Sequence, residues 1–317
     1  MAEVVRSDEE VWHYTTTAGL ESILNGRKFW ATSAAMLNDT TELGLGRSVL
    51  RELLGAAEGI SPAIKERALK LLDGNEEALV SFILSASRAG DSLTLWRNYG
   101  GHEVAYALKL DRARKLIPIE QIKGEKHPSP PPNYPKPEYE QVDEGEYALI
   151  SDPDYKFVGG GTWRRVSYIR GATDPKVTAQ VGKLVKDLTP TSNQLASVMT
   201  EYTWQSIYSP TVYWKHQGFM DEREVRAAWT AVPSWKFVKY RPGRFGLVPY
   251  IEVASWAEDL DYVPNSLDTT TERTLPITEI RIGPTRFPED AERALRMLLD
   301  DTGFGHVAIH RSGTPFR

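Results

Sequence analysis

The chain has 317 residues, of which 41% are hydrophobic and 26% charged, and its formal net charge is −5. Its basic residues are scattered, so a dedicated nucleic-acid binder is disfavoured. The absence of cysteine excludes disulfides, thiolate metal sites and a cysteine nucleophile within this sequence. No apolar run approaches about 18 residues, and the first ten residues lack the core of a signal peptide, which predicts a cytoplasmic protein without a membrane span.

Apolar periodicity, caps and turn residues predict an irregular series of strands and helices. Strands are expected at 11–14, 29–32, 79–87, 102–110, 163–169, 221–229, 247–254, 277–282 and 306–310. Helices are expected at 17–26, capped by Thr17, and at 39–54, 61–72, 91–99, 174–208 with a break at Pro190, and 289–299. Because the two kinds of element intermingle, we expect a single α+β domain over residues 1–317. Its core would be a mixed, largely antiparallel sheet with flanking helices.

Residues 126–142 contain six prolines, which cannot donate to a regular hydrogen-bond ladder. The segment is therefore predicted to be an extended loop or an insertion within the domain. Docking of a partner is a less favoured alternative.

The segment 221–229 is predicted to be a strand with acids on one face. Alternation would place Glu222, Glu224 and Arg226 on that face and the apolar residues on the other. Neighbouring carboxylates push each other's pKa values apart and can divide acid/base work. An ordinary solvated face, in which Arg226 neutralises its neighbours, is the structural alternative.

Three further polar clusters lie at the ends of elements or in turns, where scaffolds present functional groups. They are His13-Tyr14-Thr15, Asn38-Asp39 and Trp96-Arg97-Asn98-Tyr99. His13 can equally be a structural histidine. Asp39 and Glu42 have the spacing of reciprocal helix caps, an explanation that leaves Asn38 unaccounted for.

The sequence lacks the spacings of the common metal and phosphate motifs. The nearest histidine pair, His306 with His310, has no acid at a fixed spacing. The triple glycine at 159–161 precedes a strand instead of opening a helix, and no G-x-S-x-G elbow occurs. No metal is therefore expected.

The order of these clusters resembles a widespread bacterial domain-of-unknown-function family. Its members carry H-Y-T with an L-x-S-I-L helix, L-N-D-x-x-E, W-R-x-Y, F-x-x-E-x-E-V-R, I-x-I-G-P and a terminal S-x-x-P-x-R. Here these motifs stand at 13–15 with 20–24, 37–42, 96–99, 219–226, 280–284 and 312–317. The resemblance covers nearly the whole chain.

The opening segment also resembles the ADP-ribosyltransferase-like superfamily. There a histidine followed by a small residue holds the NAD ribose and nicotinamide amide, an aromatic ring stacks on nicotinamide, and a late glutamate contacts the reacting ribose. The resemblance implies a catalytic pair, Glu224 with Glu222 as the first acid. It implies NAD contacts from His13, Tyr14, Thr15, Asn38, Trp96, Arg97, Tyr99 and Arg226. Tyr99 or Trp96 would stack on nicotinamide, and Arg97 or Arg226 would bind the pyrophosphate.

The implied activity is that of an NAD-consuming ADP-ribosyltransferase or NAD glycohydrolase, suited to a toxin or phage-defence role. Its acceptor, whether protein, nucleic acid, small molecule or water, stays open. A carboxylate suits this chemistry because the ribose gains oxocarbenium-like positive charge.

Two alternatives also stay open. One is a metal-dependent nuclease or phosphotransferase using Asp39, Glu42, Glu222 and Glu224. The other is a non-catalytic binding module with a buried ion-pair network, for example Arg97 with Glu224.

Overall fold

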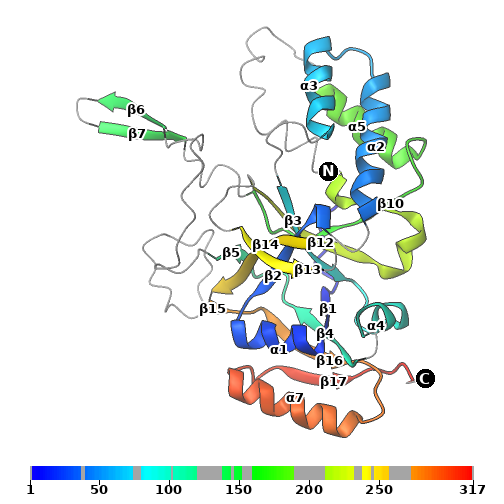
Figure 1. Cartoon of the computed structure of the whole chain (residues 1–317), viewed down its shortest axis with the longest axis vertical. Helices are drawn as coiled ribbons and strands as arrows, with labels where there is room; N and C mark the ends of the chain where they lie inside the picture. Colours follow the sequence, from blue (N-terminus) through cyan, green and yellow to red (C-terminus); the bar gives the residue numbers. More distant parts are fainter. Residues whose placement is uncertain are drawn as a thin grey trace.

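The computed structural model describes residues 2–36, 40–73, 80–100, 103–119, 138–143, 146–151, 159–188, 211–231, 238–243, 246–256 and 273–315. Most strand pairs of its main sheet are antiparallel, and helices pack against the sheet (Figure 1). The predicted α+β class and the largely antiparallel sheet are therefore confirmed. In the described parts of the chain, no helix combines the length and the apolar composition needed to cross a lipid bilayer.

The main sheet contains β1 (Trp12–Thr16), β2 (Phe29–Ser33), β3 (Val80–Ser87), β4 (Ala105–Leu110), β5 (Ile117–Pro118), β8 (Gly159–Gly160), β9 (Arg164–Arg165), β12 (Glu224–Ala231), β13 (Lys239–Gly243), β14 (Gly246–Trp256), β15 (Arg273–Thr274), β16 (Ile277–Ile282) and β17 (Ala308–Arg311). Two small sheets pair β6 (Glu138–Asp143) with β7 (Glu146–Ser151), and β10 (Ser167–Ile169) with β11 (Trp214–His216). The helices are α1 (Thr17–Gly26), α2 (Thr40–Ala56), α3 (Pro62–Asp73), α4 (Leu93–Gly100), α5 (Pro175–Leu188), α7 (Pro288–Thr302) and the short 3-10 helices η1 (Ala34–Met36) and η2 (Gln217–Glu222).

Strand β3 is the branching point of the main sheet. β12 pairs with β3 along its whole length, from Glu224 opposite Ser87 to Ala231 opposite Val80. β2 pairs with β3 near its start and β1 pairs with Ser87 at its end. The first residues of β12 therefore lie close to the start of β1.

Alternation along the strands gives the sheet two distinct faces. On the first, which we call the α1 face, Phe82, Leu84 and Val225 share a core with Leu20 of α1 and Leu299 of α7. On the opposite face, which we call the α4 face, Trp12 and Tyr14 of β1 pack with Leu95 and Trp96 of α4. Residues paired directly across two strands share a face, so Ser85, Ser87, Glu224 and Arg226 also belong to the α4 face.

A second apolar core lies apart from the sheet. It joins α2, α3 and α5 with β10 and β11, and its buried members include Leu50, Leu72, Val181, Ile169 and Trp214. Figure 1 shows these helices gathered beyond one edge of the sheet. The chain thus contains separate apolar clusters, and the single-domain organisation stays a prediction.

Several predicted elements differ in detail. Thr16, not Thr17, caps α1, because its hydroxyl accepts from the Gly19 N–H at 3.1 Å. The expected strand 163–169 is two short strands, β9 and β10. The proline-rich segment contains a strand at its end, since 138–142 belongs to β6, while 126–137 lies outside the described residues, as does the predicted helix beyond Leu188.

Candidate functional site

The turn that leads into β12 explains where Glu222 lies. Gly218 donates its N–H to His216 Nδ1 at 3.1 Å, which starts η2, and Arg223 then takes a left-handed conformation with φ 47. β12 begins only at Glu224, so the prediction of a strand from 221 is wrong for its first three residues. Strand alternation therefore does not align Glu222 with Glu224.

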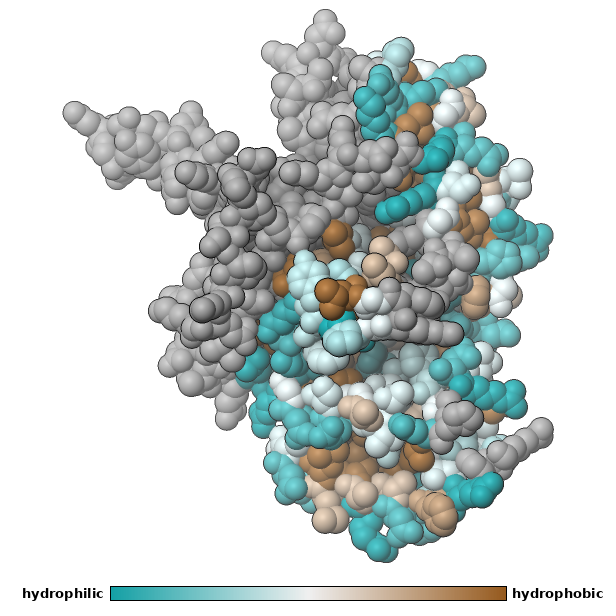
Figure 2. All heavy atoms as spheres, viewed as in Figure 1, coloured by the Kyte–Doolittle hydropathy of each residue, from teal (hydrophilic) through white to brown (hydrophobic). Residues whose placement is uncertain are grey.

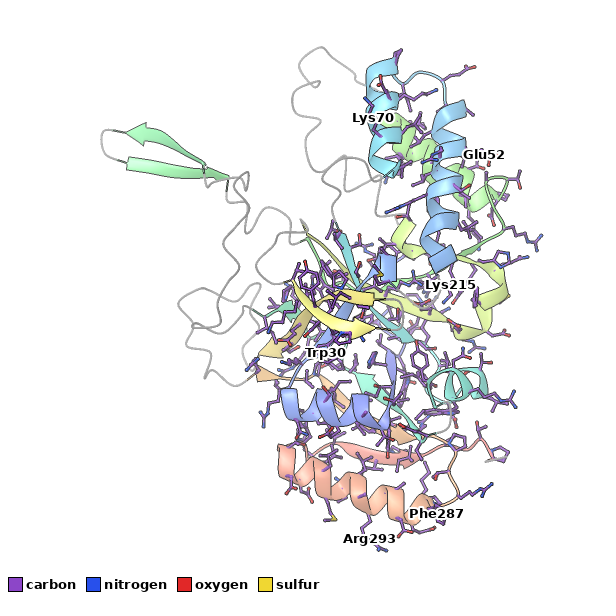
Figure 3. All side chains as sticks on the ribbon, in the orientation of Figure 1. Trp30, Glu52, Lys70, Lys215, Phe287 and Arg293 are labelled. Carbon is purple, nitrogen blue, oxygen red and sulfur yellow. The ribbon has the colours of Figure 1, made fainter. Side chains whose placement is uncertain are left out.

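Lys215 of β11 brings the two acids together instead. Its Nζ lies 2.8 Å from Glu222 Oε2 and 3.0 Å from Glu224 Oε2. The Ser87 hydroxyl donates to the Glu222 carbonyl at 2.7 Å, which fixes the turn against the end of β3. We call Lys215, Glu222, Glu224 and Arg226 the acid cluster; Figure 3 labels Lys215 where the helices meet the sheet.

Glu224 and Arg226 form the buried half of the acid cluster. Arg226 Nε and Nη2 donate to the two Glu224 oxygens at 2.7 and 2.9 Å, and Nη1 donates to the Val212 carbonyl at 2.6 Å. Glu224 is 5% exposed and Arg226 2% exposed. The solvated-face interpretation is therefore wrong for this pair, because both charges are removed from water and satisfy each other.

The neighbouring cations determine the charge of Glu224. Burial alone would raise the pKa of this carboxyl group, because an ion is poorly solvated in the interior. The Arg226 charge and hydrogen bonds, followed by Lys215 and a hydrogen bond from Ser85, outweigh burial and lower the pKa of Glu224 to about 2. Glu224 is thus a permanent anion at neutral pH.

Aromatic rings lie beside the acid cluster on the α4 face. The Tyr14 ring is centred 4.7 Å from Trp96 and 6.1 Å from Tyr99. The Tyr14 hydroxyl donates to the Ala89 carbonyl, so it is committed to the fold. Tyr99 is 38% exposed. Burial of its hydroxyl, with the negative charges of Glu224 and Glu222, raises the pKa of Tyr99 to about 12.

Two members of the site were not predicted. Lys215 bridges both acids, and the Tyr168 hydroxyl accepts from the Glu224 N–H at 2.7 Å. Burial raises the pKa of Tyr168 to about 12. The only sequence signal for Lys215 is a lysine directly after the aromatic pair 213–214, shortly before the acids. Tyr168 has no comparable signal.

His13 lies away from the acid cluster. His13 pairs with Leu108 and packs edge-to-face on Phe29, with ring centres 5.4 Å apart, and both neighbours belong to the core of the α1 face. Its Nδ1 lies 2.9 Å from the Ser85 carbonyl oxygen, and burial lowers the pKa of His13. Thr15 lies two residues after His13 on β1 and therefore points to the same face of the sheet. The sheet therefore separates His13 and Thr15 from Tyr99 and Glu224, which do lie together.

The arginines also differ from expectation. Arg97 is exposed, and Arg226 occupies the position beside Glu224 that was expected for Arg97. Arg226 is too deeply buried to bind a pyrophosphate, since its nitrogens donate to Glu224 and Val212. Asn38 and Asp39 lie outside the described residues, and so does the side chain of Glu42.

The donor set of the acid cluster does not resemble a metal site. In the described ranges no three His, Asp or Glu side chains gather as metal ligands would. The Lys215 ammonium already occupies the position between the two carboxylates where a divalent cation would have to bind. The contacts of Lys215 therefore argue against a divalent cation between Glu222 and Glu224, two of the four acids of the nuclease alternative; the side chains of the other two, Asp39 and Glu42, lie outside the described residues.

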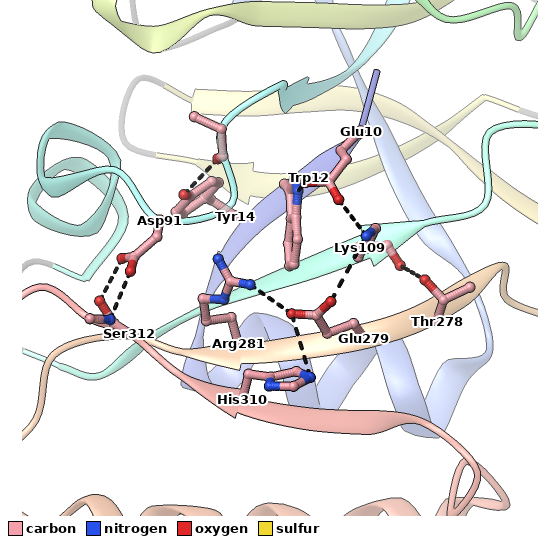
Figure 4. Close-up of polar contacts among 12 residues, drawn as sticks. Glu10, Trp12, Tyr14, Asp91, Lys109, Thr278, Glu279, Arg281, His310 and Ser312 are labelled. Carbon is pink, nitrogen blue, oxygen red and sulfur yellow. Dashed lines mark hydrogen bonds and ion pairs between the residues drawn. The ribbon is translucent and has the colours of Figure 1, made fainter. Parts of the chain in front are cut away.

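The C-terminal residues hold the start of α4 in place. Asp91 accepts from Trp96 Nε1 at 2.7 Å, from the Gly313 N–H at 2.8 Å and from the hydroxyls of Ser312 and Thr314. Figure 4 shows Asp91 and Ser312 in contact near Tyr14, beside a second polar network on the α4 face that contains Glu279 and Arg281. The terminal motif thus supports the helix that carries Tyr99.

Comparison of the chain with models of known protein families, with curated proteins and with solved structures finds no match. The two resemblances described above therefore stay predictions. The geometry of the site is the available basis for a functional proposal.

Proposed function

We propose that the chain is an NAD-consuming enzyme of the ADP-ribosyltransferase type, with its reaction at the acid cluster. The observation that carries this proposal is the juxtaposition of a partly exposed aromatic ring, Tyr99, with two carboxylates that share one lysine. A planar ring suits stacking on nicotinamide, and fixed carboxylates suit a ribose that gains positive charge.

The burial of the two acids favours a division of roles that differs from the sequence-based one. Glu222 keeps a side-chain exposure of 18%, whereas Glu224 is held by Arg226, Lys215 and Ser85. Glu222 would therefore face the ribose. The bond from ribose C1′ to nicotinamide would break with its electron pair leaving on nicotinamide, the acceptor oxygen would attack C1′, and Glu222 would take the acceptor's proton.

Glu224 would then be a positioning residue. Its permanent negative charge holds the Lys215 ammonium, and the same ammonium fixes one oxygen of Glu222 at 2.8 Å. His13 and Thr15 would take no part in the reaction, because they lie on the α1 face.

The test is release of nicotinamide from NAD by the purified chain in the presence of EDTA. Glu222→Gln is expected to lower the rate by about 100-fold or more, the usual effect of removing a group that stabilises a transition state. Asp221→Asn is the matched control, since Asp221 is an exposed acid on the same short helix. Absence of nicotinamide release by the wild type, or equal rates in Glu222→Gln and wild type, would contradict the proposal.

A second candidate, the non-catalytic binding module, is favoured by one observation. Both oxygens of Glu224 are occupied by Arg226 and Lys215 in a buried ion network, as expected for a structural element. This candidate predicts that Glu224→Gln destabilises the fold, and that neither the wild type nor any variant cleaves NAD.

A further inference from the structure

A cavity of about 940 Å³ opens next to the acid cluster. Its walls are formed by residues 165–168, 170 and 173–176, by Gln180 of α5, by Gln217 and Met220 of η2, and by Glu3 and Arg88. Tyr168 lines the cavity, and its hydroxyl accepts a hydrogen bond from the Glu224 N–H. The cavity is therefore in contact with the acid cluster through Tyr168. Its volume lies within the range of sites that enclose nucleotide-sized molecules.

Four cationic side chains line this cavity, together with the two acids Glu3 and Asp174: Arg88, Arg165, Arg170 and Lys176. Arg165 is already neutralised, because it donates to Glu9 and Glu3. Arg88 Nη1 also pairs with Glu9, at 2.8 Å. Two of the four cations, Arg88 and Arg165, are therefore paired with acids.

Arg170 and Lys176 are the cations without acid partners. Within the described part of the chain neither has a carboxylate within ion-pair distance; Arg170 Nε donates to Gln217 at 2.7 Å. Asp174 lies between them in sequence, but its oxygens accept from the backbone N–H groups of Arg170 and Lys176 at the start of α5. Both side chains are exposed, so their remaining donors can reach a ligand.

The guanidinium group of Arg88 also lines this cavity. Its Nε is buried, and no hydrogen-bond acceptor for it lies among the described residues. A buried donor without a partner is costly, which is why such groups are rare unless a ligand satisfies them. Guanidinium groups match phosphate oxygens in geometry and charge.

We propose that this cavity binds the diphosphate group of a nucleotide. Arg170 and Lys176 would hold the phosphate oxygens, Arg88 would complete the anion site, and the remaining volume beside Tyr168 and Met220 would accommodate the nucleoside. The inference rests on the cavity and its charges. It does not rest on the proposed NAD cleavage, because a nucleoside diphosphate has no nicotinamide bond.

The test is calorimetric titration of the full chain with ADP, pyrophosphate and adenosine. We expect ADP and pyrophosphate to bind, and adenosine to bind at least tenfold more weakly than ADP. In the double variant Arg170→Gln/Lys176→Gln the ADP affinity is expected to fall by about tenfold or more. Each hydrogen bond from a cation to a phosphate oxygen contributes to the free energy of ADP binding, and the variant removes two cations. Both side chains are exposed, so the variant should keep its circular dichroism spectrum.

A matched control removes the same amount of positive charge from α5, the helix that carries Lys176. Lys183→Gln/Lys186→Gln changes two exposed lysines of α5 that do not line the cavity, and it should alter ADP affinity by less than about threefold. Failure of ADP to bind, equal loss of affinity in both double variants, or adenosine affinity equal to that of ADP would overturn the proposal. ADP affinity is measured without any cleavage of NAD, so this result and the NAD assay can fail independently.

Discussion

Arg226 donates two parallel hydrogen bonds to the Glu224 carboxylate, from Nε to Oε1 at 2.7 Å and from Nη2 to Oε2 at 2.9 Å. The two residues are next-but-one neighbours on β12, so strand alternation alone puts them on the same face. Lys215 adds a second cation to the same carboxylate. Removing the Glu224 carboxylate would leave two cations, Arg226 and Lys215, without this partner. Removing one of the two cations would still leave Glu224 paired with the other.

Glu224→Gln is therefore expected to lower the free energy of unfolding by about 3–5 kcal/mol, the usual cost of breaking a buried ion pair. Urea denaturation followed by tryptophan fluorescence measures this change. Glu224→Leu/Arg226→Met should cost less than Glu224→Gln, because it removes both charges of the pair. A single variant as stable as the wild type would contradict the buried network.

Stability should fall steeply in acid. The pKa of Glu224 is about 2 in the folded chain, against 4.5 for an unperturbed group, and Glu9 is lowered to about 2 as well. A carboxyl group whose pKa is lower in the folded than in the unfolded chain stabilises the fold fully at pH values above its unfolded pKa. This contribution is lost as the pH falls from 4.5 towards 2. Urea midpoints measured between pH 6 and pH 3 should fall less steeply in Glu224→Gln; parallel curves would count against this assignment.

Asp91→Asn should loosen the attachment of the C-terminal residues to α4. Several donors converge on this carboxylate, so its loss is expected to lower the free energy of unfolding by roughly 1–3 kcal/mol and to shift the fluorescence of Trp96. Ser312→Ala removes one donor and should have a smaller effect, below about 1 kcal/mol. If Asp91→Asn and Ser312→Ala lowered the free energy of unfolding equally, the several hydrogen bonds accepted by Asp91 would contribute no more than the one from Ser312.

Two glycines should respond in opposite directions to alanine. A Cβ at Gly90 would lie 2.3 Å from the Trp12 ring, so Gly90→Ala is expected to cost roughly 1–3 kcal/mol. A Cβ at Gly182 on α5 meets nothing within 4 Å, so Gly182→Ala should stabilise the helix by about 0.5–1 kcal/mol. Thermal melts of both variants measure these changes, and a neutral Gly90→Ala would contradict the close packing of Gly90 against Trp12.

Periodicity predicted most of the secondary structure because it reports local constraints. Helix α3 begins at Pro62, where a proline fits the first turn, and β3, β14 and β16 follow their apolar runs. The start of β12 was not predictable in this way. His216 caps a short 3-10 helix and Arg223 adopts a left-handed conformation, and neither event changes the alternation of polar and apolar residues.

The candidate site was predicted in part. Trp96, Tyr99 and Glu224 share the α4 face, as a single cleft would require, but the histidine beside Tyr14 does not. Neighbouring residues of a strand point to opposite faces, so a motif written as consecutive letters cannot all serve one site. Lys215 was not predicted because its partners lie on other elements, Glu224 on a strand of the main sheet and Glu222 on η2, and such pairings depend on tertiary packing.

Lys215 also has a mechanical consequence. It follows Trp214, a member of the core formed by α2, α3 and α5, while its partner Glu224 belongs to the main sheet. Arg226 strengthens this link by donating to Val212 on the approach to β11. An ammonium ion and a guanidinium ion thus couple the two cores, so that opening of the helical core would expose charges in the sheet. We therefore expect the main sheet and the helical core to unfold together in one transition.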